Sequence, residues 1–171
     1  MRPSTLFCRS TADFSRDRTY RYSLTRQWGD GRTVNFVMLN PSTADEYAND
    51  PTVERCQRRA VEWGFDGLIV TNLFAMRATD PRTLWVVDDP VGPRNDEALI
   101  ASALDAKLII CAWGNHGSRA GRSRFVAVML RNLGKPLHIL RLARSGEPWH
   151  PLYLPYSVKP REWTRSKLEE E

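Results

Sequence analysis

The sequence has few cysteines, no long apolar run and no glycine-rich nucleotide loop, and each absence excludes a class of protein. Its three cysteines, Cys8, Cys56 and Cys111, stand far apart and fit neither a zinc site nor a disulfide framework. No stretch approaches the roughly 18 apolar residues that a membrane-spanning helix requires. A Walker-type loop and a GxGxxG motif are both missing, which argues against NTPases and dinucleotide-dependent enzymes.

The same absences bear on where the protein works. Residues 1–10 contain neither a long apolar stretch nor a small-residue cleavage site, so they indicate no secretory signal. Cys56 and Cys111 stand in apolar patterns and are interpreted as small buried side chains. We therefore expect a cytoplasmic protein with no membrane partner. Its 171 residues, 42% of them hydrophobic, predict a single domain over residues 1–171.

What the sequence does have is an excess of positive charge. The formal net charge is +5, which is compatible with a nucleic-acid partner. We expect DNA, duplex or single-stranded, as the partner and a monomeric protein. The alternative is an ordinary solvated basic surface, since no block of five like charges occurs. Charge alone does not decide between the two.

The N-terminal part predicts an irregular lead-in followed by a β-hairpin. Residues 1–18 are polar with few apolar anchors, whereas residues 20–24 and 34–39 have the composition of strands. Between them, residues 27–32 contain two glycines, which permit the positive φ angles of a tight turn.

The rest of the chain alternates helices with buried strands. Asp50 followed by Pro51 is typical of a helix start, because the carboxylate caps the first turn and proline fits the first helical position. Continuous apolar runs fit strands that are covered on both faces. Helices are predicted over 51–63, 95–106 and 122–133, strands over 67–72, 107–112 and 137–142, a long connection over 77–93 and a mostly coil tail over 155–171.

This alternation predicts an α/β fold: a three-layer α/β/α arrangement with a mainly parallel four-stranded central sheet plus an N-terminal β-hairpin. Ligands of such sheets bind at the carboxyl ends of the strands. The unusual polar residues of this sequence follow strands at those ends, in the segments 40–42, 71–72, 113–116 and 149–151. We expect these four segments to converge on one site.

Asn40 is the first candidate of this site. It precedes Pro41, which excludes it from a helix, and its amide offers both a donor and an acceptor to a water or a polar edge. Ser42, Thr43 and Asp45 follow, and two interpretations of them remain open. They contact a ligand, or they cap a short turn.

Asn72 and the histidines are the next candidates. A buried amide at a strand end such as Asn72 either satisfies a neighbouring loop or pairs with the edge of a planar heterocycle. His116 and His150 have no carboxylate at a diagnostic spacing, so no hydrolytic triad is indicated, and no metal or cofactor is expected. Arg119 and Arg122 stand at a helix start, where they either bind phosphates or form a solvated basic face.

The motifs as they stand resemble a prokaryotic and phage family of unknown function. The resemblance rests on Leu39-Asn40-Pro41-Ser42-Thr43-Ala44-Asp45, Asp50-Pro51-Thr52, Thr71-Asn72-Leu73-Phe74-Ala75 with Arg77, Trp113-Gly114-Asn115 and His150-Pro151-Leu152-Tyr153. It covers residues 20–154 and brings no established activity.

The order of these segments is also similar to that of the uracil-DNA glycosylase superfamily. Asn40-Pro41 resembles its first motif, Asn72 its base-reading asparagine, Trp113-Gly114 a later strand end and His150-Pro151 its final motif. Ser42 stands where a glycine often follows, and Asp45 lies beyond the usual place of a water-activating aspartate. The last motif continues with Leu152-Tyr153 rather than Ser-Pro.

This second resemblance implies a glycosylase-like fold and a hydrolase that removes a damaged or modified base. Asn40 would position the attacking water and His150 would stabilise the departing base. The residues expected to bind substrate are Pro41, Ser42, Thr43, Asp45, Asn72, Phe74, Trp113, Asn115, His116 and Tyr153, and those expected to bind phosphate are Arg77, Arg119 and Arg122. Two alternatives stay open: a non-catalytic module that binds nucleotides or nucleic acid, and an enzyme acting on a small nucleoside-like metabolite.

Overall fold

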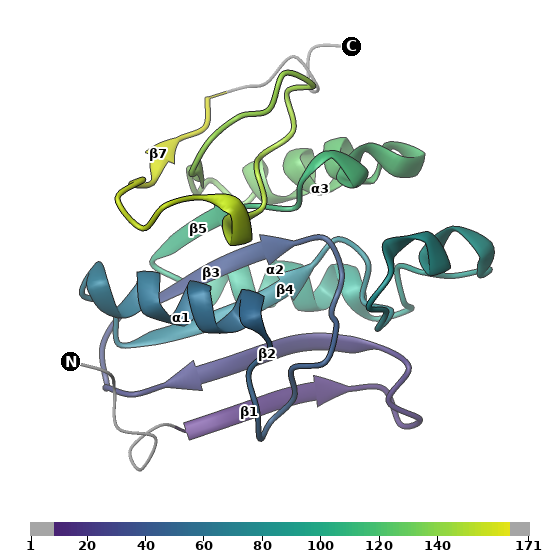
Figure 1. Ribbon diagram of the computed structural model, residues 1–171, viewed down its shortest axis with the longest axis horizontal. Helices are drawn as coiled ribbons and strands as arrows, with labels where there is room; N and C mark the ends of the chain where they lie inside the picture. The colour runs from purple at the N-terminus through teal and green to yellow at the C-terminus, as the bar shows by residue number, and fades with distance from the viewer. Residues whose placement is uncertain (1–8, 165–171) are drawn as a thin grey trace.

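The computed structural model describes residues 9–164, which form a seven-stranded mixed sheet with helices on both faces (Figure 1). The strand order is β1-β2-β4-β3-β5-β6-β7. The strands are β1 (Arg9–Phe14), β2 (Arg21–Gln27), β3 (Thr33–Met38), β4 (Gly67–Asn72), β5 (Leu108–Cys111), β6 (Leu137–Ile139) and β7 (Arg161–Glu162). The α-helices are α1 (Pro51–Glu62), α2 (Asn95–Asp105) and α3 (Arg122–Arg131), and the 3-10 helices are η2 (Pro81–Val86), η3 (Asn115–Gly121) and η4 (Pro151–Tyr153).

The centre of the sheet confirms the predicted parallel arrangement. Strands β4, β3, β5 and β6 pair in parallel, so their carboxyl ends lie along one edge. All six residues of β4 are buried, as a strand with helices on both faces requires. The sheet is larger than predicted, because antiparallel strands extend it on both sides.

Two apolar cores, one on each face of the sheet, confirm the three predicted layers. Val53, Cys56 and Ala60 of α1 pack with one set of strand side chains. Leu99 and Ala103 of α2 join side chains of α3 in the core of the other face. The buried Cys56 and Cys111 pack as small apolar residues in these two cores, as expected.

The start of α1 follows the predicted mechanism. The Asp50 carboxylate accepts a hydrogen bond from the Val53 backbone N–H at 2.9 Å, and Pro51 occupies the first helical position. This cap fixes where the helix begins relative to the end of β3. The helix ends before Gly64, whose φ of +82° permits the chain to reverse toward β4.

The predicted hairpin of residues 20–24 and 34–39 is wrong. Strand β4 lies between β2 and β3, and β2 pairs antiparallel with β4 on one side and with β1 on the other. The turn after β2 wraps around the start of β4, where the N–H groups of Trp28 and Gly29 both donate to the Asp66 carbonyl. Because this turn is bound to the residue that precedes β4, strand β4 occupies the place between β2 and β3.

Strand β1 also corrects the predicted irregular lead-in. Residues 9–14 pair with β2 along its whole length, so this polar segment forms the sheet edge. Its alternating exposed and half-buried residues lack the apolar signal of a core strand. The part of the predicted coil tail that is described contains the short edge strand β7. Within residues 9–164 no helix is long and apolar enough to cross a membrane.

Candidate functional site

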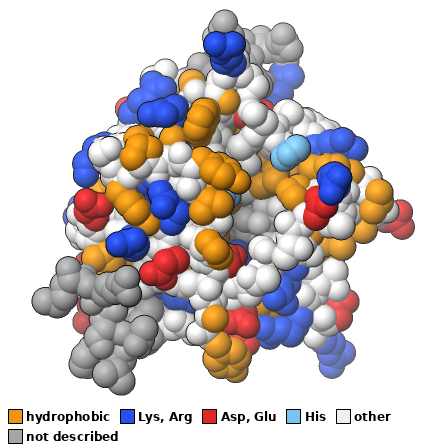
Figure 2. Space-filling model, viewed as in Figure 1, with side chains coloured by type: hydrophobic (Ala, Val, Ile, Leu, Met, Phe, Trp, Pro, Cys, Tyr) orange, Lys and Arg blue, Asp and Glu red, His pale blue; other side chains and the backbone are white. Residues whose placement is uncertain are grey.

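A cavity of about 610 Å³ opens at the carboxyl ends of β3 and β5. The chain passes from β3 to β4 on one side and later returns to β5 on the other, so the strand order reverses here. Such a switch point is where open α/β sheets bind ligands. Figure 2 shows a hollow in this face with hydrophobic side chains gathered beside it.

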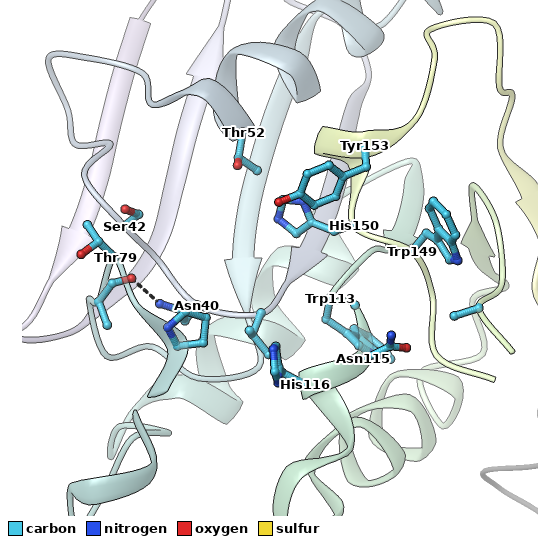
Figure 3. Close-up of a pocket in the computed structure, with 15 residues that line it drawn as sticks. Asn40, Ser42, Thr52, Thr79, Trp113, Asn115, His116, Trp149, His150 and Tyr153 are labelled. Carbon is cyan, nitrogen blue, oxygen red and sulfur yellow. Dashed lines mark hydrogen bonds between the residues drawn. The ribbon is translucent and has the colours of Figure 1, made fainter. Parts of the chain in front are cut away.

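Five separate segments supply the walls of this pocket (Figure 3). They are the segment after β3, the start of α1, the connection after β4, the start of η3 and the loop between β6 and η4. The lining residues are Leu39, Asn40, Ser42, Thr52, Ala78, Thr79, Pro81, Trp113, Gly114, Asn115, His116, Ala143, Trp149, His150 and Tyr153.

Asn40 lies at the end of β3 with its amide held in one orientation. Its Nδ2 donates to the carbonyls of Pro41 at 3.0 Å and Ala78 at 2.7 Å. Because carbonyl oxygens only accept hydrogen bonds, both protons of the amide are used, and Oδ1 is left as the acceptor for a ligand or water. The side chain thus links the β3 and β4 connections on one wall of the pocket.

His150 caps η4 on another wall. Its Nδ1 accepts the backbone N–H of Leu152 at 3.2 Å, so the proton of the neutral ring resides on Nε2. Burial lowers the pKa of His150 to about 4, partly offset by the negative charge of Asp50. At neutral pH the ring is therefore an uncharged donor through Nε2. The ring of Tyr153 lies beside it, with centroids 6.1 Å apart (Figure 3).

The lining contains no lysine, arginine, aspartate or glutamate among the described residues. Hydrogen-bonding capacity comes instead from hydroxyls, amides and imidazoles. The hydroxyls of Ser42, Thr52, Thr79 and Tyr153 have no intramolecular partner within residues 9–164. An uncharged pocket rich in free polar groups and aromatic rings suits a polar, planar and uncharged ligand.

Trp113 forms the wall at the end of β5 and is held from several sides. Its side chain is only 1% exposed, and Trp163 packs edge-on at a centroid distance of 5.8 Å. Gly117 lies directly against the indole, where a larger residue would collide with it. The indole Nε1–H donates to Glu147 at 2.6 Å. The wall is therefore rigid.

The structure brings together seven of the predicted catalytic and substrate-binding residues. Asn40, Ser42, Trp113, Asn115, His116, His150 and Tyr153 all line the pocket. They come from three stretches that are far apart in sequence, as the predicted convergence at the sheet edge requires.

Asn72 and Phe74 do not reach the pocket, contrary to prediction. Asn72 is 1% exposed, and its Oδ1 accepts from Arg21 at 3.4 Å inside the protein. Phe74 is 2% exposed and packs edge-on against Trp85 in the apolar core. Phe74 therefore stabilises the core. The Asn72 side chain accepts from a buried arginine, its Nδ2 has no hydrogen-bond partner within residues 9–164, and it does not satisfy a neighbouring loop, which was the alternative to base recognition.

Pro41, Thr43 and Asp45 also lie outside the lining. Asp45 caps the turn, because its carboxylate accepts the backbone N–H groups of Tyr47 and Ala48. The bond to Tyr47, followed by that to Ala48, lowers the pKa of Asp45. Pro41 is buried and Thr43 is exposed. Of the two interpretations of this segment, capping holds for Asp45, while Ser42 faces the pocket.

The three predicted phosphate-binding arginines differ in availability. Arg122 is only 7% exposed and donates to the Leu73 carbonyl and to Asp96, so its placement does not fit the prediction. Arg119 is exposed, with its guanidinium stacked over the Trp85 ring at 4.8 Å. Arg77 is half-buried beside the Ser42 carbonyl. Arg119 and Arg77 are therefore available to bind an anion.

Sequence reasoning missed several residues of the site. Thr52 follows the predicted helix cap, Thr79 lies in the long connection and Trp149 precedes His150. Only Trp149 had a signal, because it belongs to one of the four polar segments expected to converge, whereas Thr52 in α1 and Thr79 in the long connection do not directly follow a strand. Glu147 had no signal, because a single glutamate in a loop looks like any solvated charge. Within residues 9–164 no cluster of histidine, cysteine, aspartate or glutamate has the geometry to hold a metal ion.

Residues 21–152 match the model of a family described as a protein of unknown function (DUF1643). This match covers six of the seven predicted residues that line the pocket, and Tyr153 lies just beyond it. Comparisons with curated proteins and with solved structures found no match.

Proposed function

The chain belongs to the DUF1643 family of proteins of unknown function, and because that description names no activity, we propose a function from the pocket itself. The protein is a DNA glycosylase-like enzyme that hydrolyses the N-glycosidic bond of a damaged or modified base. A fold related to the uracil-DNA glycosylase superfamily belongs to the same proposal.

The observation that carries the proposal is the pairing of Asn40 and His150 across one uncharged pocket (Figure 3). Asn40 offers an acceptor through Oδ1, whereas His150 offers a donor through Nε2. These opposite capacities match the two ends of the reaction. The attacking water must donate to an acceptor, and the departing base must accept from a donor.

The missing carboxylate determines which step comes first. Without a strong base in the pocket, water attacks only after the bond between sugar and base has begun to break. The electron pair of that bond passes to the base nitrogen, where the neutral His150 donor stabilises the developing negative charge. Water held by Asn40 then adds to the sugar carbon and releases its proton to the base or to solvent.

The base would be recognised by the polar groups of the pocket other than Asn40 and His150. Asn72 is inside the protein, so the base edge meets the amide of Asn115 and the hydroxyls of the lining. The nucleotide would leave the base stack to enter the cavity. Its phosphates would stay outside the uncharged pocket and meet exposed cations such as Arg119, with an affinity that falls as salt rises.

A second candidate function is a non-catalytic module that binds a nucleotide or nucleic acid through the same pocket. The same missing carboxylate favours this alternative, because a site without a general base can bind a heterocycle without activating a water to cleave it. An enzyme acting on a free nucleoside is the third candidate, and it would require no contact with phosphate.

The test is base release from duplex and single-stranded oligonucleotides that carry a panel of modified bases, read as abasic sites. We expect one substrate class to be cleaved, with Asn40→Ala and His150→Ala each lowering the rate by about 100-fold or more, as for the loss of a transition-state hydrogen bond. Asn132→Ala, at an exposed asparagine after α3, is the matched control and should keep the wild-type rate. Binding without any release would reject the glycosylase and support the binding module.

A further inference from the structure

Glu147 is a buried acid between two walls of the pocket. It is 1% exposed, and no ion pair within residues 9–164 includes it. Its Oε2 accepts the indole N–H of Trp113 at 2.6 Å, and its Oε1 accepts the hydroxyl of Ser123 at 2.8 Å. Both carboxylate oxygens are therefore used, one by a donor from the segment after β5 and the other by a donor from α3.

An ionised carboxylate accepts both hydrogen bonds with the two donors as they stand. A carboxylate accepts at both oxygens, whereas a protonated acid or a glutamine carries a donor on one side. If that donor faced the Trp113 indole, which only donates, the hydrogen bond would be lost; if it faced Ser123, the hydroxyl would have to reverse its direction and accept. A buried hydrogen bond that is lost leaves a polar group unsatisfied, and the folded state is then destabilised by the desolvation of that group.

Glu147 also stands at the base of the segment that carries His150. Its backbone carbonyl accepts from Ala143 at 2.9 Å, closing a tight turn after β6. The next residue, Pro148, accepts the N–H of Gly114 at 2.8 Å, which ties this segment to the end of β5. Side-chain and backbone bonds together fix the Trp113 wall and the start of the His150 segment relative to each other.

We propose that Glu147 is the positioning residue of the pocket, and that its carboxylate holds Trp113 and the His150 segment in their ligand-binding arrangement. This role rests on the proposed function only in requiring that the pocket binds a ligand. Burial raises the pKa of Glu147, partly offset by the bonds from Trp113 and Ser123, and no charged group contributes to the shift. The carboxylate that accepts from both donors prevails above that raised pKa and is replaced by the protonated acid as the pH falls through it.

The test uses two NMR signals of the whole protein and needs no substrate. The indole N–H resonance of Trp113 is assigned with Trp113→Phe, and the ring protons of His150 with His150→Gln. In the wild type we expect the Trp113 signal to move as Glu147 takes up its proton, at a pH above the ordinary glutamate value of 4.5.

Glu147→Gln should abolish the pH-dependent movement of the Trp113 signal. It should also raise the pKa of His150 from about 4 toward its ordinary 6.5, because a loosened segment admits water to the ring. Ser123→Ala, which removes one donor only, should move both signals in the same direction by less, and it decides the question if Glu147→Gln does not fold. Glu54→Gln, at an exposed acid of α1, is the control and should change neither signal.

A Trp113 signal that ignores pH, or a His150 titration unchanged in both variants, would overturn the positioning role. If no oligonucleotide is cleaved but both signals behave as expected, the role of Glu147 stands and the glycosylase alone is rejected.

Discussion

His150 combines a lowered pKa with a fixed tautomer, and both follow from where its ring lies. The ring is held by one backbone N–H, is half-buried and faces the cavity. A charged imidazolium would have to give up the Leu152 bond, because Nδ1 would then carry a proton. The site therefore keeps the ring neutral, with Nε2 as its donor. The folded protein resists protonation of this ring, which lowers its stability only when the solution becomes acidic.

This resistance to protonation predicts the pH dependence of stability. In the unfolded chain His150 takes up a proton near pH 6.5, but in the folded protein only near its lowered pKa of about 4. The unfolded state thus binds more protons between these values, and the free energy of unfolding falls as the pH drops through this window. At about pH 5 the loss attributable to His150 is about 2 kcal/mol relative to neutral pH.

Urea denaturation of the wild type and of His150→Gln at both pH values measures this loss. The variant should lose less stability on acidification, by about the same 2 kcal/mol. His116→Gln, at an exposed histidine of the same pocket, is the matched control and should behave as the wild type. Parallel pH profiles for the wild type and His150→Gln would show that the ring titrates normally.

At the scale of elements, α1 anchors the segment that follows His150. Arg59 of α1 is fully buried, and its Nη2 donates to the carbonyls of Leu154 at 2.8 Å, Pro155 at 3.3 Å and Pro151 at 3.5 Å. A planar guanidinium presents several donors at once, so one side chain satisfies several carbonyls of an irregular segment. The helix thereby sets the position of η4 and of the two rings, His150 and Tyr153, at the pocket.

Arg59→Met should lower the free energy of unfolding by about 3 kcal/mol, because it removes three hydrogen bonds from a buried charged donor to the carbonyls of Pro151, Leu154 and Pro155, each worth about 1 kcal/mol. It should also weaken any activity of the pocket, since η4 loses its anchor. Arg58→Ala, at the exposed neighbour that lies over the Tyr156 ring at 5.0 Å, should change stability by no more than about 1 kcal/mol. Chemical denaturation of both variants measures the difference, and equal stabilities would remove Arg59 from this role.

For the whole molecule, the sheet order predicts a gradient of protection. Strand β3 lies in the middle and pairs with β4 on one side and β5 on the other, under both apolar cores. Strand β7 has two exposed residues at the edge of the sheet. Amides that open only with global unfolding should therefore concentrate in β3 and its neighbours, whereas β7 opens locally.

Hydrogen exchange followed by NMR measures this gradient. We expect the hydrogen-bonded amides of β3 to exchange the slowest and that of Trp163, next to β7, to exchange faster, although its N–H donates to Leu137 at 2.8 Å. Slower exchange at Trp163 than in β3 would contradict the gradient.

The sequence by itself determined the elements of the central α/β unit and the edge at which polar residues gather. Apolar runs and the Asp50-Pro51 cap are local signals, because burial pattern and capping depend on neighbours in the chain. Asn40 and His150 were identified in the same way, as unusual residues just beyond strand ends. Such signals are local, so one sequence suffices to detect them.

Only the tertiary structure decided which strand pairs with which and which side chains face the pocket. The predicted hairpin was wrong because the turn at Trp28 binds Asp66 of another segment, a contact with no trace in local composition. Asn72 points into the protein, and the lone Glu147 holds a wall of the pocket. Partners far apart in the chain fix these orientations, and a single sequence does not record which distant groups will meet.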